Sequence, residues 1–181
     1  MNTSSISHSL RKYRKWHRLL GITIGLLVLI SSITGVFLAW KKEAATLQPP
    51  SMQSSAAASQ PWLGVEEISR RATEALMEKS GLAQLSIDRL DIRPDKGIAK
   101  VRFEQGYWEV QVDGKTGEIL SIARRHSDWI EQLHDGSIIS DSFKVISMNV
   151  LGAGLLVLTL SGTWLWLGPK KIRQLKKKQK A

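Results

Sequence analysis

An uncharged run of 22 residues, from Leu19 to Trp40, limits what this chain can fold into. As an α-helix such a run is about 33 Å long, which matches the ~30 Å hydrocarbon core of a bilayer. A cleaved secretory signal has a shorter apolar stretch, of ~7–15 residues, and ends in small residues. The only plausible cleavage site, after Ala39, has Phe37 where a small residue is needed. We therefore expect a membrane anchor and not a leader.

A second uncharged run of 25 residues lies between Lys144 and Lys170. Two apolar helices in a soluble domain would have to be covered by protein on every side, and a chain of 181 residues leaves too little protein for that. We predict transmembrane helices at residues 19–40 and 144–168.

The basic residues predict the orientation of these helices. The net charge is +10, yet all 16 acidic residues lie between Glu43 and Asp141, and the ends of the chain hold the excess of Lys and Arg. Basic residues near span ends stay on the cytoplasmic side. We expect cytoplasmic tails at residues 1–18 and 169–181 and a periplasmic central domain, in a bacterial inner membrane. The same distribution argues against nucleic acid as a partner.

No catalytic constellation stands out in the sequence. The chain lacks cysteine, which excludes a disulfide, a thiolate nucleophile and a Cys-ligated metal. It also lacks a nucleophile elbow, a P-loop and an HExxH zinc motif. We predict no catalytic residues and no metal site.

The central region reads as a tethered α+β domain. Residues 41–61 are largely Ala, Ser, Gln and Pro, which predicts a flexible linker. An apolar stripe at helical spacing runs from Val65 to Leu76, and Gly81 suits the C-cap. Alternating segments between residues 85 and 123 predict antiparallel strands with one apolar and one polar face, and a bulge near Ile87. We expect this domain at residues 62–125.

A short amphipathic helix or loop, at residues 126–143, leads back to the membrane. The residues expected on one side of this helix are His126, Trp129, Ile130, Leu133 and His134. We expect this side to lie on the lipid surface or on the sheet.

The spans contain two further groups of residues with a predicted role. Aromatic residues at membrane interfaces are Trp16, Trp40, Trp164 and Trp166. Small residues that suit close helix packing are Gly21, Gly25, Ser31, Gly35, Gly152, Gly154 and Gly162. This packing joins either the two spans of one chain or the spans of two copies. Each span contains a hydroxyl residue followed by a glycine, which are Thr34-Gly35 in the first span and Ser161-Gly162 in the second.

Three motifs together resemble one family. They are residues 14–21 with Thr34-Gly35, residues 133–136 with 160–166, and the strand-turn-strand at residues 108–120. They are similar to PepSY-associated transmembrane (PepSY_TM) proteins, whose larger members have about four spans and two PepSY domains. This chain would be a small member with two spans and one PepSY-like domain, so a function that needs four helices is not expected of a monomer.

The resemblance implies haem as a cofactor, since some larger members resemble haem-carrying ferric-siderophore reductases. Its matching positions are His17 and His134, with His126 a weaker candidate. His17 and His134 are expected at opposite faces, on the order of 30 Å apart, so one iron cannot bind both. A two-fold dimer would pair equal residues at equal depth. The plainer interpretation makes His17 a headgroup contact and His134 a helix-end residue.

Three functions follow as hypotheses. The first is a non-catalytic accessory or regulatory subunit that presents its domain to a periplasmic protein or peptide. The second is a component that binds haem b and serves membrane electron transfer or iron uptake. The third is an inhibitor of an extracytoplasmic peptidase. Expected partners are membrane lipids and a second copy or a larger membrane protein.

Overall fold

The computed structural model describes residues 3–57 and 59–180. Residues 1–2 and 181, in the predicted tails, and Ala58, in the predicted linker, lie outside the described residues. The chain divides into two compact units, one made by residues up to Gly35 with those from Gln132 onward, the other by Val36–Glu131.

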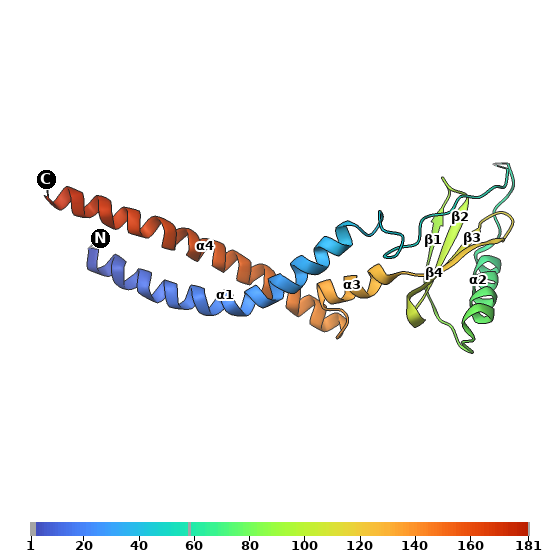
Figure 1. The fold of residues 1–181 in the computed structure, drawn as a ribbon, viewed down its shortest axis with the longest axis horizontal. Helices are drawn as coiled ribbons and strands as arrows, with labels where there is room; N and C mark the ends of the chain where they lie inside the picture. The colour runs from blue at the N-terminus through green and yellow to red at the C-terminus, as the bar shows by residue number, and fades with distance from the viewer. Residues whose placement is uncertain (1–2, 58, 181) are drawn as a thin grey trace. The chain divides into compact units, whose positions relative to one another are not determined.

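The first unit is a pair of long helices, α1 (Thr3–Ala39) and α4 (Asp141–Lys180). Their chain ends lie at the same end of the pair, as Figure 1 shows in blue and red. The segments His8–Ala39 and Asp141–Gln174 are long and apolar enough to cross a membrane. Both helices extend past the uncharged runs into the basic tails, and α4 continues through Pro169.

Glycines form notches in which side chains of the opposite helix sit. Ile24, which is 2% exposed, packs against Gly154, where an added Cβ would lie 2.6 Å from its Cδ1. Leu10 fills a similar notch at Gly168. Gly25 and Gly152 face open space, so they do not form this interface.

The second unit contains the predicted α+β domain. Its sheet has the order β1-β2-β3-β4 and all neighbours are antiparallel. The strands are β1 (Ile87–Arg93), β2 (Ile98–Phe103), β3 (Trp108–Asp113) and β4 (Ile119–Arg124), and the short 3₁₀ turn η1 (Gln105–Tyr107) precedes β3. The irregular pairing between Ile87 and Arg89 confirms the bulge.

Helix α2 (Val65–Ser80) covers one face of this sheet (Figure 1). Its buried residues are Ile68, Ala72 and Leu76, which lie on the stripe that the periodicity predicts. Gly81 ends the helix in the left-handed conformation, with φ at 69°, as a C-cap glycine does. Two apolar helices, one before and one after a helix-plus-sheet domain in the sequence, confirm the α+β membrane architecture.

The polar face of the sheet is buried too, which the alternation does not predict. Glu109, Gln111 and Asp113 are at most 1% exposed. A segment that we call the strap, residues 47–57, binds here by hydrogen bonds. Gln111 donates to the carbonyl of Pro50 (2.9 Å) and accepts from the amide of Met52 (2.8 Å). This part of the expected flexible linker is therefore attached to the sheet, because its backbone groups satisfy the buried amide.

Helix α3 (His126–Asp135) follows the sheet and ends at Gly136, whose φ is 84°. Ile130 is buried as expected, but Trp129 and Leu133, from the same predicted apolar side, are 40% and 37% exposed.

Gly154→Val should weaken the helix pair. The new methyl groups meet Ile24, which is buried and has no free space to move into, so we expect a loss of about 1–3 kcal/mol in the free energy of unfolding. Unfolding by SDS titration in mixed micelles measures it. Gly152→Val, half a turn away, faces open space and should change the value by less than about 0.5 kcal/mol. Equal effects of the two variants would contradict the interface.

Candidate functional site

His17 lies half-buried on α1 and contacts α4. Its Nδ1 is 2.8 Å from the hydroxyl oxygen of Ser161, and an added Cβ at Gly162 would lie 3.3 Å from its Cε1. The hydroxyl and the glycine of the second span thus form a seat for this ring. The glycine allows the ring to approach the helix backbone, and the hydroxyl satisfies one ring nitrogen.

The hydroxyl of Ser161 fixes which nitrogen of His17 carries the proton. Its single hydrogen points to the carbonyl of Val157 at 2.7 Å, with that of Leu158 at 3.2 Å, and carbonyl oxygens only accept. Its oxygen therefore accepts from the N–H at Nδ1 of His17. In the neutral ring Nε2 then carries a lone pair, which is the form that binds a metal.

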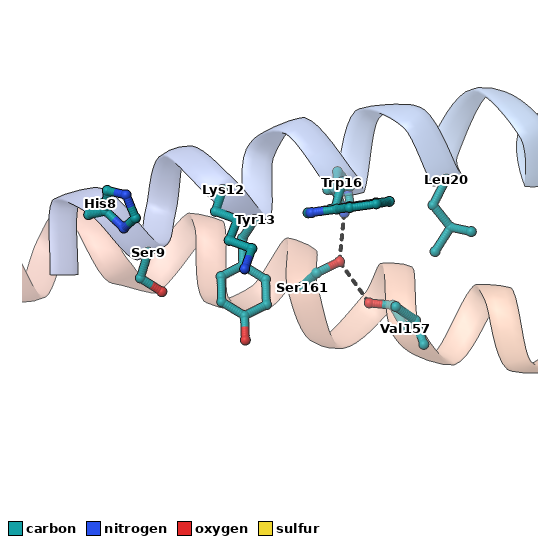
Figure 2. Close-up of a pocket in the computed structure, with 9 residues that line it drawn as sticks. His8, Ser9, Lys12, Tyr13, Trp16, Leu20, Val157 and Ser161 are labelled. Atoms are coloured by element: carbon teal, nitrogen blue, oxygen red, sulfur yellow. Dashed lines mark hydrogen bonds between the residues drawn. The ribbon is translucent and has the colours of Figure 1, made fainter. Parts of the chain in front are cut away.

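A cavity of about 640 Å³ adjoins this ring (Figure 2). This volume falls in the range of ~300–1,000 Å³ that is typical of ligand sites. Most of the lining is apolar and aromatic, with one cation, Lys12. The lining residues are His8, Ser9, Lys12, Tyr13, Trp16, His17, Leu20, Val157 and Ser161.

A second cavity, of about 450 Å³, shares four lining residues with the first: Ser9, Tyr13, Val157 and Ser161. It is also lined by Trp164, whose Nε1 is buried and has no hydrogen-bond partner among the described residues. An unpaired buried donor is costly, so it marks a place where a ligand acceptor would be stabilised.

His134 has the same kind of seat at the other end of the helix pair. Its Nδ1 is 3.0 Å from the hydroxyl of Thr34, and an added Cβ at Gly35 would lie 3.4 Å from its Cε1. Thr34 donates its hydrogen to the carbonyl of Ile30 at 2.7 Å, so this ring too is protonated at Nδ1 in its neutral form. Ser31 adds a hydrogen bond to the carbonyl of His134 (3.2 Å).

The two histidine seats differ in the space beside them. The cavity lined by His134 has about 200 Å³, which is less than the ~300 Å³ of small ligand sites. Thr34, beside His134, follows His17 by 17 residues on α1, or about 25 Å of helix. The structure therefore does not bring His17 and His134 together, in agreement with their expected separation.

The other predicted site residues fall into distinct places. His126 is exposed, at the start of α3. Trp16, Trp40 and Trp166 are exposed, and Lys170 lies 3.6 Å over the ring of Trp166. Of the small residues, Gly21, Ser31, Gly35, Gly154 and Gly162 contact the partner element of their own unit. The described residues contain no group of three or more His, Asp or Glu that could hold a metal ion.

A buried charge network in the second unit is not predicted by the sequence. Glu109 accepts from Arg125 at 2.6 Å and from Gln111 at 2.9 Å, and Lys100 lies 3.4 Å away. Asp128 pairs with Arg125 and with Arg102. Alternation places these side chains on one sheet face, but only tertiary structure shows that the face is covered.

Burial alters the titration of this network. Burial lowers the pKa of Lys100, and the nearby Glu109 carboxylate offsets only part of this effect. Burial would lower the pKa of Arg125 as well, but the charges of Asp128 and Glu109 raise it above its ordinary value. Arg125 therefore stays charged, and its two carboxylate partners hold it in place.

One protein family has a model that matches this chain. Its description is the PepSY-associated TM region, and the match covers residues 14–181. This range contains both apolar helices, the sheet domain and both histidine seats. No curated protein matches the chain.

Ser161→Ala should change the tautomer of His17. Without the hydroxyl acceptor, Nδ1 loses its fixed proton and the ring populates the Nε2–H form. The ¹⁵N chemical shifts of selectively labelled histidine in micelles report the two forms. Thr163→Ala is the matched control, because its hydroxyl bonds only within its own helix, to the carbonyl of Thr159 at 2.8 Å. A wild-type ring already protonated at Nε2 would contradict the seat.

Proposed function

Since the chain belongs to the family of PepSY-associated transmembrane proteins, we propose that it is a membrane haem protein in which His17 would hold the haem iron. The observation that carries this proposal is the hydrogen bond of Ser161 to Nδ1 of His17, which leaves Nε2 as the ligating nitrogen of a ring that lines a cavity of about 640 Å³. The haem is of b type, because a chain without cysteine cannot form the thioether links of a c-type haem.

The residues around His17 fit such a group. The apolar and aromatic lining suits a porphyrin, and the ammonium group of Lys12 suits its carboxylates. The unpaired Nε1 of Trp164, in the adjoining cavity, offers a further donor. When bound, haem iron supplies one-electron chemistry, and the seat at Ser161-Gly162 orients the ligand ring.

A second histidine to hold the haem would come from a second copy of the chain. His8 lines the same cavity but is exposed, nine residues before His17 on α1. A dimer with its axis along the membrane normal places His17 opposite His17 of the other copy. Gly25, which faces open space, offers a small surface for the contact. His134, with little space beside it, serves as a packing residue.

The basic tails support the orientation in this proposal. Both chain ends carry Lys and Arg and lie at the same end of the helix pair (Figure 1), so both are cytoplasmic in a bacterial inner membrane. The site at His17 is then near the cytoplasmic face, and the sheet domain is periplasmic.

The absorption spectrum of full-length protein, purified in mild detergent from haem-replete cells, tests the proposal. We expect a Soret band with reducible α and β bands, lost in His17→Ala because the iron loses its ligands. His8→Ala and His134→Ala should keep the bands. A spectrum without these bands, or bands unchanged in His17→Ala, would refute haem ligation by His17.

The second candidate is a binding subunit that presents its sheet domain to a periplasmic protein or peptide. The observation that favours it is the position of β1 at a sheet edge, where Ile87 and Ile92 are 36% and 43% exposed. An exposed strand edge with apolar side chains suits the addition of a peptide strand. A peptidase is the partner that the PepSY resemblance implies, and the subunit would then act as its inhibitor.

A photoreactive amino acid at Ile92 of the full chain, in its own membrane, tests this candidate. A partner that pairs with β1 should give one defined adduct, which Ile87→Asp abolishes by disrupting the edge. The matched position is Glu74, which is exposed on α2. Adducts of equal yield at both positions, or none, would count against strand addition.

A further inference from the structure

A polar groove of about 550 Å³ opens on the second unit, apart from the histidine seats. Its lining contains seven cations and one acid, which is a strong excess for a unit, Val36–Glu131, with 14 acidic and 13 basic residues. The cations are Lys41, Lys42, Arg93, Lys96, Lys100, Arg102 and Arg125. From this composition we propose that the groove binds the phosphate of an anionic phospholipid headgroup.

The carboxylates around the groove do not balance its cations. Asp91 pairs with Arg93 at 2.7 Å, and Lys41 pairs with Glu131 at 3.6 Å. Glu109 and Asp128 form ion pairs with three further cations of the groove, which are Lys100, Arg102 and Arg125. Four carboxylates therefore face seven cations, and Lys42 and Lys96 have no ion pair among the described residues.

Lys100 keeps donors for a ligand at the base of the groove. Its side chain is 4% exposed, and its ammonium group has three N–H donors. Its contact with Glu109, at 3.4 Å, is longer than the ~2.7–2.9 Å of a charge-assisted hydrogen bond. The Glu109 carboxylate already accepts from Arg125 and Gln111. A phosphate oxygen beside Lys100 would give this buried ammonium a second acceptor in addition to Glu109.

The groove begins where the membrane helix ends. Helix α1 ends at Ala39, and Trp40, which is 64% exposed, is the aromatic residue expected at the interface. Lys41 and Lys42 follow at once and line the groove. Phospholipid phosphates lie where a membrane span ends, so Lys41 and Lys42, the residues that directly follow the span, are within reach of a lipid headgroup.

The mixed set of Arg and Lys suits phosphate. Guanidinium groups bind phosphate oxygens with two parallel N–H donors, and ammonium groups add point charge. The ion pairs of Arg102 and Arg125 with Asp128 hold these side chains in place before a ligand arrives.

Photo-cross-linking with a diazirine phosphatidylglycerol tests the proposal on the full chain in phosphatidylcholine nanodiscs. We expect labelled peptides that cover residues 41–51 or 91–102. The double variant Lys42→Gln/Lys96→Gln, which removes the two cations without ion pairs, should reduce this labelling by about 30-fold, since each basic residue near a membrane contributes ~1 kcal/mol. The control Arg89→Gln/Arg124→Gln changes the charge of the same sheet equally, outside the groove, and should leave the labelling within about twofold.

Three outcomes would overturn the proposal. Labelling confined to the basic tails would place the lipid elsewhere. Equal losses in the two double variants would reduce the effect to net charge. Displacement of the label by inorganic phosphate as effectively as by unlabelled phosphatidylglycerol would show that the groove takes a soluble anion.

Discussion

The structure of the membrane unit depends on one constraint, which is that a polar side chain within the bilayer must find its hydrogen bonds in protein. Imidazole, hydroxyl and glycine satisfy that constraint together. His17 donates to Ser161, and His134 donates to Thr34, while each hydroxyl donates to a carbonyl of its own helix. The adjacent glycines, Gly162 and Gly35, allow the rings to approach. Hydrogen bonds of this kind occur at both histidine seats, and the notch at Gly154 joins the helices between them.

The same constraint explains why the two seats can differ in function. Both hydroxyls leave Nε2 with a lone pair, but only the ring at His17 lies beside a cavity of the size of a ligand site. In the sheet domain, burial acts on charges in a similar way. Glu109 is saturated by its partners, and the excess of cations around it opens to a groove. Each unit thus has a polar side chain that bonds to protein through one of its groups and has another free for a ligand. In the membrane unit this side chain is His17, and in the sheet domain it is Lys100.

Much of this architecture follows from sequence patterns. The uncharged runs predict the spans, and the alternation in residues 98–113 predicts which strand residues face α2. The pairing of Ser161 with His17 does not follow, because it depends on how two antiparallel helices are aligned, and notches such as the one that Gly154 offers Ile24 determine that alignment. The repeated pair of hydroxyl residue and glycine, at Thr34-Gly35 and Ser161-Gly162, is the sequence signal that could have identified the two histidine seats. The sequence does not predict that the polar face of the sheet is covered, because the strap has no periodic pattern of side chains. The strap binds Gln111 through its backbone groups and not through its side chains.

The central claim is that the hydrogen bond between His17 and Ser161 joins the two membrane helices. A double-mutant cycle with His17→Phe and Ser161→Ala, followed by SDS unfolding in micelles, measures this directly. We expect a coupling free energy of about 0.6 kcal/mol, the mean measured for hydrogen bonds between membrane helices, and no more than the maximum of ~1.7 kcal/mol. A coupling indistinguishable from zero would mean that the two side chains act independently, and it would contradict the seat on which the proposed ligation rests.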